Sequence, residues 1–241
     1  MDPRAAAVDD RLAGVDRIVA VTGSKGGIGK SVISTSLALA WADEGRRVGL
    51  FDLDFTSPSD HVILGAAGHF PAEDFGVDPL LIEGVRTMSV AFFSGEAAAP
   101  LRGGDVTNTL LELLAITRWG DLDILVLDLP PGLGDIALDV VRLVPRTEFL
   151  LLGAASRVVI GSVRRALRLL IELHAPIVGV VENLRRDGDN SVAELAGQFG
   201  VPFLGVVPYD PGLEDALGDP QLLRNTRLFG TVRGIARSVA G

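Results

Sequence analysis

Short runs of apolar residues alternate along the chain with longer stretches in which apolar residues recur at helical spacing. The runs that predict strands lie at residues 17–22, 48–53, 122–127, 149–153, 177–181 and 203–207. The stretches that predict helices lie at residues 31–44, 135–143, 158–173 and 191–199. Strands that are apolar throughout and alternate with helices are typical of a parallel sheet covered on both faces. The pattern predicts an α/β fold with a doubly wound, mostly parallel sheet flanked by helices.

The predicted elements form a single domain. Residues 1–16 are polar and predict a short lead-in, frayed or helical, while residues 17–241 contain every predicted strand and no linker that would divide them. Residues 65–104 are rich in glycine, alanine and proline and are the hardest to assign; we expect a hairpin around residues 81–93.

The composition narrows the class of protein. The chain has 241 residues, of which 48% are hydrophobic, so it is long enough to bury a core. Its apolar runs are far shorter than the roughly 20 residues that span a bilayer. Its first residues, MDPRAAAVDD, are unlike a signal sequence, so we expect a soluble, cytoplasmic protein. A net charge of −9 argues against a general affinity for nucleic acid.

The candidate chemistry is concentrated between the strand at 17–22 and the helix at 31–44. Residues 23–31 read Gly-Ser-Lys-Gly-Gly-Ile-Gly-Lys-Ser and hold both lysines of a chain whose other basic residues are arginines. Consecutive glycines let backbone N–H groups turn towards a phosphate, and the following helix presents its positive N-terminus. The segment predicts a phosphate-binding loop in which Lys30 reaches the β- and γ-phosphates and the Ser31 hydroxyl binds Mg²⁺. The general pattern G-x-x-x-x-G-K-[ST] is imperfectly met, because Ser24 occupies its first position.

Acidic and amide residues follow the other predicted strands. Asp128 ends the strand beside the loop and Asp52 ends its neighbour, where carboxylates can hold Mg²⁺ through water. Asp54 lies two residues further on and is expected to point towards the γ-phosphate, which the N–H of Gly132 could also sense. Asn183 offers a donor and an acceptor to an adenine edge. The alternative is that these acids and the asparagine only mark strand ends.

Several motifs resemble the MinD/ParA/Mrp group of P-loop ATPases. Residues 25–31 match its deviant loop K-G-G-x-G-K-[ST], and F-D-L-D-F-T-S-P-S at 51–59 resembles its first switch segment. L-D-L-P-P-G-L-G-D at 127–135 is similar to a segment of the Mrp branch, and V-V-E-N at 180–183 and V-P-Y-D-P at 207–211 resemble its base-binding segments.

The resemblance implies roles for individual residues. Lys25 would cross a dimer interface to the partner's nucleotide, and Asp54 would orient or deprotonate the attacking water. The residues expected to bind ATP or ADP are Gly26, Gly27, Ile28, Gly29, Lys30, Ser31, Val32, Gly132, Asn183, Pro208 and Asp210. The residues expected to hold Mg²⁺ are Ser31, Asp52 and Asp128.

One feature of the Mrp branch is missing. In that branch, the segment after V-E-N carries a C-x-x-C pair that holds an iron–sulfur cluster between subunits, whereas residues 184–190 here read L-R-R-D-G-D-N, and the chain has 0 cysteines. Cluster ligation needs thiolates, so no cluster is expected from the chain itself. The histidines, His61, His69 and His174, are scattered and are expected to be surface or packing residues.

The C-terminal segment 224–241 has four arginines, no acids and apolar residues at roughly helical spacing. We favour a last helix packed on the sheet; a basic amphipathic membrane contact is the alternative. The sequence as a whole predicts a Mg²⁺-dependent ATPase that forms an ATP-gated homodimer and acts on an unidentified client protein. Its role could be metal-cofactor or iron–sulfur protein maturation, MinD- or ParA-like positioning, or nucleotide sensing with negligible turnover.

Overall fold

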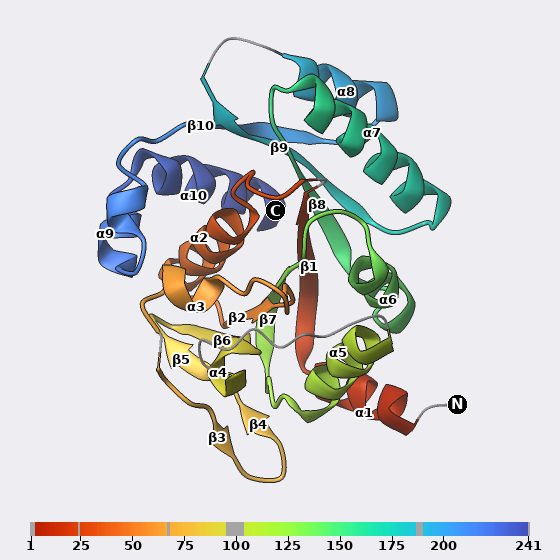
Figure 1. Ribbon diagram of the computed structural model, residues 1–241, viewed down its shortest axis with the longest axis vertical. Coiled ribbons are helices and arrows are strands. Elements are labelled where there is room, and N and C mark those ends of the chain that lie inside the picture. The colour runs from red at the N-terminus through yellow and green to blue at the C-terminus, as the bar shows by residue number, and fades with distance from the viewer. Residues whose placement is uncertain (1–2, 24, 67, 95–103, 187–189, 241) are drawn as a thin grey trace.

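The computed structural model describes residues 3–23, 25–66, 68–94, 104–186 and 190–240. Its main sheet has the strand order β10-β9-β8-β1-β7-β2-β6-β5, and every pairing is parallel except that of β5 with β6 (Figure 1). The strands are β1 (Val15–Gly23), β2 (Val48–Asp52), β5 (Leu80–Ile82), β6 (Val85–Ser89), β7 (Leu122–Asp128), β8 (Glu148–Gly153), β9 (Ile177–Arg185) and β10 (Phe203–Pro208). The predicted α/β fold with a mostly parallel sheet is confirmed.

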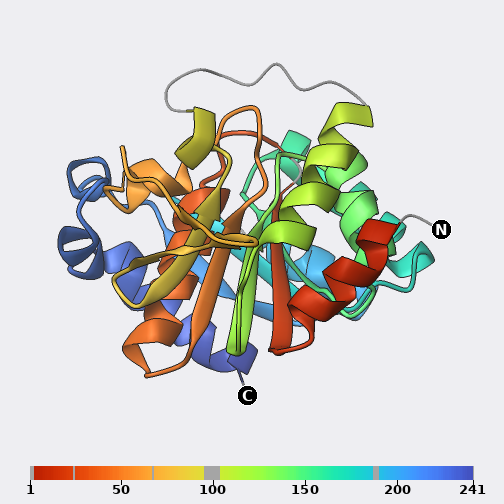
Figure 2. The same ribbon diagram turned by 90° about the horizontal axis from the view of Figure 1, so that it is seen from below.

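Helices cover both faces of this sheet (Figure 2). On one face lie α2 (Lys30–Asp43), α3 (Asp60–Ile63), α9 (Pro220–Arg224) and α10 (Arg227–Ala240). On the other lie α1 (Pro3–Leu12), α5 (Gly104–Ile116), α6 (Asp135–Leu143), α7 (Arg157–Glu172) and α8 (Ser191–Phe199). The remaining elements are short: β3 (Ala72–Glu73), β4 (Val77–Asp78), α4 (Ala91–Ser94) and η1 (Glu214–Ala216).

The lead-in before residue 17 is helical and packs on the domain. Val8 and Leu12 of α1 are buried, and the Arg11 guanidinium donates a hydrogen bond to the Ala115 carbonyl at 3.1 Å. The hairpin expected around residues 81–93 is formed by β5 and β6 and is followed by α4. Helix α5, which holds α1 in place, falls in a stretch for which the sequence pattern predicts no helix.

The C-terminal helix packs on the domain, as favoured from the sequence. Its apolar residues Leu228, Phe229, Val232, Ile235 and Val239 are all buried. The indole N–H of Trp41 in α2 donates to the carbonyl of Ala236 at 3.0 Å. The apolar face of α10, which would have to be exposed for contact with a membrane, is therefore part of the core.

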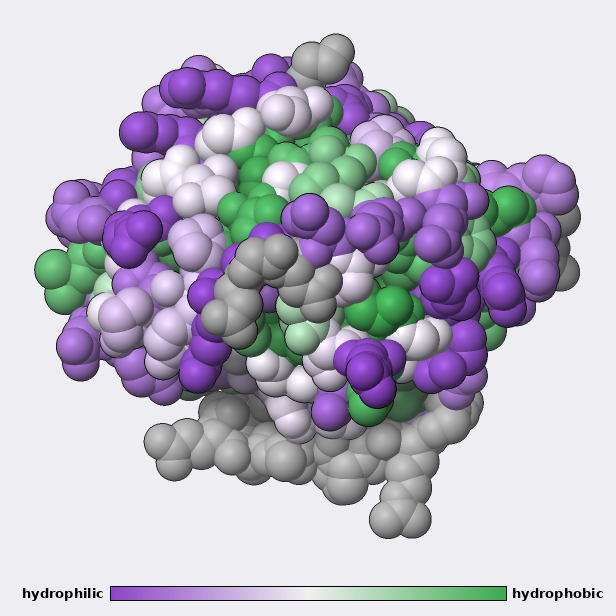
Figure 3. Space-filling view, turned by 90° about the horizontal axis from the view of Figure 1, so that it is seen from above, coloured by the Kyte–Doolittle hydropathy of each residue, from purple (hydrophilic) through white to green (hydrophobic). Residues whose placement is uncertain are grey.

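Some apolar residues lie on the surface of the domain. At the end of the molecule where β10 and α8 lie, hydrophobic residues are bordered by hydrophilic ones (Figure 3), and β10 is an edge strand whose residues are mostly half-buried. No helix within the described ranges is long and apolar enough to cross a bilayer.

Parallel pairing brings the carboxyl ends of the central strands to one edge of the sheet. Asp128 of β7 is the register partner of Asp52 in β2 and of Val21 in β1. The loop from β1 to α2 and the segments that follow β2 and β7 therefore meet at this edge, which is where α/β sheets bind ligands.

Candidate nucleotide and magnesium site

The glycine-rich loop connects β1 to α2 and has a backbone that only glycine tolerates well. Gly27 and Gly29 have φ values of +77° and +81°. A Cβ atom at Gly29 would also lie 2.6 Å from the Nδ2 atom of Asn183, and one at Gly23 would lie 2.5 Å from the side chain of Ile28. The loop sequence is thus fixed by backbone conformation and by close packing against β9.

The N-terminus of α2 is suited to binding an anion such as phosphate. Lys30, its first residue, is only 7% exposed, while Ser31 and Val32 are half-buried and no side chain caps the helix. Uncapped N–H groups at the start of a long helix form a favourable site for phosphate. Lys25 and the neighbouring Gly26 are exposed, and Ser24 lies outside the described residues.

Three buried carboxylates lie beside the loop, although the sequence pattern predicts only two. One oxygen from each of Asp52, Asp60 and Asp128 lies within 4.8 Å of the others. Asp52 accepts hydrogen bonds from the backbone N–H groups of Asp54, Ser59 and Asp60 at 3.1, 2.9 and 3.2 Å. These bonds fold the segment after β2 back over the end of its own strand.

The other two carboxylates are tied to α2. The Ser34 hydroxyl donates to Asp128 Oδ1 at 2.8 Å, and the Thr35 hydroxyl donates to Asp60 Oδ1 at 2.9 Å. The second oxygens, Asp128 Oδ2 and Asp60 Oδ2, are buried and have no hydrogen-bond partner among the described residues.

Burial disfavours the charged form of all three groups. It raises the pKa of Asp52 to about 7, assisted by the charge of Asp128 and opposed by the three backbone N–H groups. Burial likewise raises the pKa of Asp128 to about 6, against the nearby hydroxyls of Ser31 and Ser34 and the charge of Lys30. The pKa of Asp60 is raised well above its usual value by burial and by the charges of Asp128 and Asp52.

These residues fit Mg²⁺. The ion prefers oxygen ligands, and the cluster offers carboxylate oxygens that lack partners beside the Ser31 hydroxyl. No histidine belongs to the cluster in the described part of the chain. A divalent cation would neutralise charge that burial otherwise makes costly.

Asp54 is anchored locally rather than buried in the cluster. It is half-buried, and its Oδ1 atom accepts hydrogen bonds from the Thr56 hydroxyl at 2.8 Å and from the Ser57 N–H at 3.1 Å. It lies near the start of the segment between β2 and α3.

Two groups expected to contact nucleotide are bonded to the loop itself. The N–H of Gly132, a residue with φ +86°, donates to the Gly23 carbonyl at 2.8 Å. Asn183 is 1% exposed and donates through Nδ2 to the Ile28 carbonyl at 2.8 Å, while its Oδ1 is buried and has no partner in the described part of the chain. The segment after β7 and strand β9 therefore both hold the loop, through Gly132 and Asn183 respectively.

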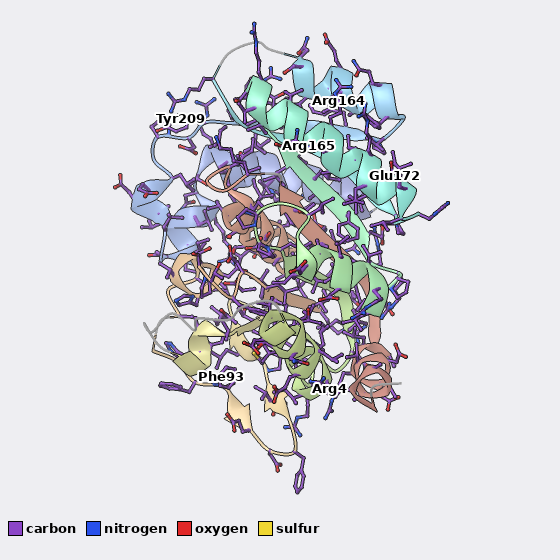
Figure 4. All side chains as sticks on the ribbon, turned by 45° about the vertical axis from the view of Figure 1, so that its right-hand side comes forward. Arg4, Phe93, Arg164, Arg165, Glu172 and Tyr209 are labelled. Carbon is purple, nitrogen blue, oxygen red and sulfur yellow. The ribbon has the colours of Figure 1, made fainter. Side chains whose placement is uncertain are left out.

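The segment after β10 serves the C-terminal part of the fold. Asp210 accepts hydrogen bonds from the N–H of Gly212 and the N–H of Leu228, both at 3.1 Å, which fixes the start of α10. Pro208 is half-buried at the end of β10, and the Arg186 guanidinium lies 4.2 Å from the ring centroid of the next residue, Tyr209. Figure 4 shows Tyr209 at the same end of the molecule as Arg164 and Arg165 of α7.

The comparisons with known proteins agree with this architecture. The sequence matches the ParA family model, described as NUBPL iron-transfer P-loop NTPase, over residues 14–227. The chain belongs to this family. Among NUBPL-type relatives, the iron–sulfur cluster carrier protein of Saccharolobus solfataricus is 32% identical over 237 residues, covering 90% of this chain and 80% of that protein. That of Pseudomonas fragi is 35% identical over 233 residues, covering 87% and 81%.

Solved structures extend the likeness to three dimensions. A nucleotide-binding protein from Archaeoglobus fulgidus in complex with ADP superposes with a TM-score of 0.80 at 26% identity, covering 94% of this chain and 95% of that one. The cell division ATPase MinD of Pyrococcus furiosus gives a TM-score of 0.71 at 21% identity, covering 93% and 98%. The NUBPL-type chain therefore shares its fold with MinD.

Proposed function

We propose that this protein is a Mg²⁺-dependent ATPase that converts ATP and water to ADP and phosphate. The observation that carries the proposal is the glycine-rich loop, which leads into the N-terminus of α2, where no side chain caps the helix. Lys30 and the three buried carboxylates lie beside this loop. ADP in the Archaeoglobus fulgidus relative supports it.

The roles follow from where each group lies. Lys30 and the N–H groups of the loop bind the phosphates, and Ser31, Asp52 and Asp128 would hold Mg²⁺, which neutralises phosphate charge during transfer. Asp54 orients the attacking water, or takes its proton, from the segment after β2. Gly132 and Asn183 reach the nucleotide by giving up their bonds to the loop carbonyls.

We further propose an ATP-gated homodimer. Lys25 is exposed at the outer side of the loop, while Lys30 already serves the phosphates of its own subunit. A second subunit docked on this face would bring each Lys25 to its partner's phosphates, where an added positive charge stabilises the transition state.

The biological role that the family supports best is iron–sulfur or other metal-cofactor protein maturation. The relatives are named iron–sulfur cluster carriers, but this chain has 0 cysteines, so any cluster it handles must take thiolates from a client protein or a small thiol. A MinD-like positioning role is less favoured, because the apolar face of α10 is buried.

Nucleotide-stripped protein tests the ATPase proposal. A ligand at 100 times its dissociation constant stabilises a fold by about 2.7 kcal/mol, so ATP with Mg²⁺ should raise the melting temperature of the wild type. Lys30→Ala should lose this shift, and Arg233→Ala, which removes an exposed positive charge on α10, should keep it. An unmoved wild-type melting temperature at millimolar ATP would refute nucleotide binding.

Three further assays separate the possible roles. Phosphate release distinguishes an ATPase from a sensor with negligible turnover, and ATP-dependent sedimentation with liposomes or DNA would point to positioning instead of maturation. Protein purified without oxygen should be colourless and lack stoichiometric iron and sulfide. A cluster retained by the purified chain alone would contradict the role assigned to external thiolates.

A further inference from the structure

Asp60 occupies an unusual place for an acid at the start of a short helix. An acid in the first turn of a helix normally lies exposed at the N-terminus, where its negative charge interacts favourably with the helix dipole. The side chain of Asp60 is instead fully buried. Its Oδ1 atom accepts a hydrogen bond from the hydroxyl of Thr35 in the neighbouring helix α2. The residue joins the segment after β2 to the helix that begins the phosphate site.

The second oxygen of Asp60 is available to a ligand. Asp60 Oδ2 and Asp128 Oδ2 are buried and lack a hydrogen-bond partner among the described residues. The Asp60 N–H donates to Asp52 Oδ2 at 3.2 Å, and one oxygen from each of the three carboxylates lies within 4.8 Å of the others. Buried carboxylate oxygens normally have a partner, and a cation would supply one to both of these atoms at once.

The spacing of the oxygens suits a divalent cation. On an octahedral Mg²⁺, with a metal–oxygen distance of about 2.1 Å, two oxygens lie about 3.0 Å apart when adjacent and about 4.2 Å apart when opposite. The three carboxylate oxygens lie within 4.8 Å of one another. To share one ion, the three side chains would draw closer together by rotation.

We infer that Asp60 is a third carboxylate ligand of the site, so that this protein binds a hard divalent cation before any nucleotide arrives. The inference extends the Mg²⁺ site of the proposed function and rests on it. In a site formed by the Ser31 hydroxyl and two carboxylates alone, half of the positions around the cation are left to water and phosphate. A third buried carboxylate adds a ligand that does not depend on the nucleotide.

The test uses Mn²⁺ alone as the probe. Full-length protein is stripped of nucleotide, and its metal is removed with a chelator. The protein is then titrated with Mn²⁺ while the concentration of the free ion is followed by electron paramagnetic resonance. We expect one Mn²⁺ per chain, bound at least tenfold more weakly by Asp60→Asn, which keeps an acceptor for Thr35. Asp74→Asn removes the same charge from the exposed β3–β4 hairpin and should bind as the wild type does.

A second measurement covers the case in which Asp60→Asn fails to fold. In wild-type protein, water-proton couplings of bound Mn²⁺ should report at most about three water ligands, because the three carboxylate oxygens fill half of an octahedral shell and the Ser31 hydroxyl can take one further position. The inference is overturned if no Mn²⁺ site is found at millimolar metal, if four or more waters are bound, or if a folded Asp60→Asn variant binds Mn²⁺ with wild-type affinity. If ATP with Mg²⁺ still stabilises the wild type, the proposed ATPase survives that failure; if Mn²⁺ binds but ATP does not, only the ATPase proposal fails.

Discussion

Replacing Asp128 by asparagine should stabilise the nucleotide-free, metal-free protein above neutral pH. The buried Asp128 carboxylate lies beside those of Asp52 and Asp60, and its Oδ2 atom has no partner in the described part of the chain. Asparagine keeps an oxygen that can accept the hydrogen bond from the Ser34 hydroxyl. Its amide N–H₂, in the place of Oδ2, can donate to a neighbouring carboxylate.

The magnitude follows from the pKa of Asp128. Folding raises it from 3.8 to about 6, and each unit corresponds to about 1.4 kcal/mol, so the charged group costs on the order of 3 kcal/mol. A carboxyl whose pKa is raised holds its proton more tightly when folded. The cost is therefore absent below pH 3.8, grows as the pH rises, and is complete above about pH 6. Loss of the Asp128 charge also removes one cause of the raised pKa of Asp52, which is about 7.

Urea denaturation in a chelating buffer measures the effect, with the fluorescence of Trp41 and Trp119 as the signal. At pH 8 the variant should exceed the wild type by about 1–3 kcal/mol in free energy of unfolding, after allowance for the altered hydrogen bonds. The advantage should shrink at pH 5.5. Asp74→Asn, exposed and remote, should leave the free energy of unfolding unchanged at both pH values. A variant no more stable than the wild type at pH 8, or equally favoured at both pH values, would refute the reasoning.

Three further predictions concern the loop and the segment after β2. Asp54→Ala should keep nucleotide affinity but lose a factor of about 10²–10⁴ in phosphate release; unchanged hydrolysis would exclude it from the mechanism. Lys25→Ala should bind ATP within a fewfold of wild type yet fail to dimerise with ATP, by light scattering on an Asp54→Ala background; a dimer of wild-type affinity would confine the lysine to its own subunit. Alanine at Gly27 or Gly29 should lower the free energy of unfolding by about 1–2 kcal/mol, because both positions have a positive φ. The loss should be larger at Gly29, because only there would the added Cβ atom also lie 2.6 Å from the Asn183 side chain. Equal losses in the two alanine variants would show that the contact with Asn183 is unimportant.

Local patterns were sufficient for the sheet and for the loop. A buried parallel strand needs an unbroken apolar run, and the phosphate loop needs glycines within a few residues, so both leave a signature that is contiguous in the sequence. Asp52 and Asp128 are recognisable for the same reason, because each directly ends such a run. Their register pairing in β2 and β7 follows from the parallel order of the strands.

The features that the sequence pattern did not predict depend on distant contacts. Asp60 follows Pro58 and Ser59 at a helix start, where an acid ordinarily serves the helix N-terminus; only the packing of α3 on α2 turns it inward to Thr35. Asp210 was assigned to the base-binding segment by resemblance, and its hydrogen bonds to Gly212 and Leu228 depend on where α10 docks. Helix α5 begins at the end of the glycine-, alanine- and proline-rich stretch 65–104, which obscures the helical spacing at its start.

The hydrogen bonds made by the loop also constrain how ATP can be bound. Gly132 and Asn183, both expected to contact nucleotide, donate to the carbonyls of Gly23 and Ile28. Transfer of these donors to ATP exchanges one hydrogen bond for another and gains little, since a typical net hydrogen bond contributes only about 0.5–1.5 kcal/mol. In the proposed ATPase, the affinity would therefore come mainly from charge, through Lys30, the N-terminus of α2 and a divalent cation on the buried carboxylates. Exchange of the two donors would instead report nucleotide occupancy to β9 and to the segment after β7, which are the parts of the fold that a partner subunit or client could sense.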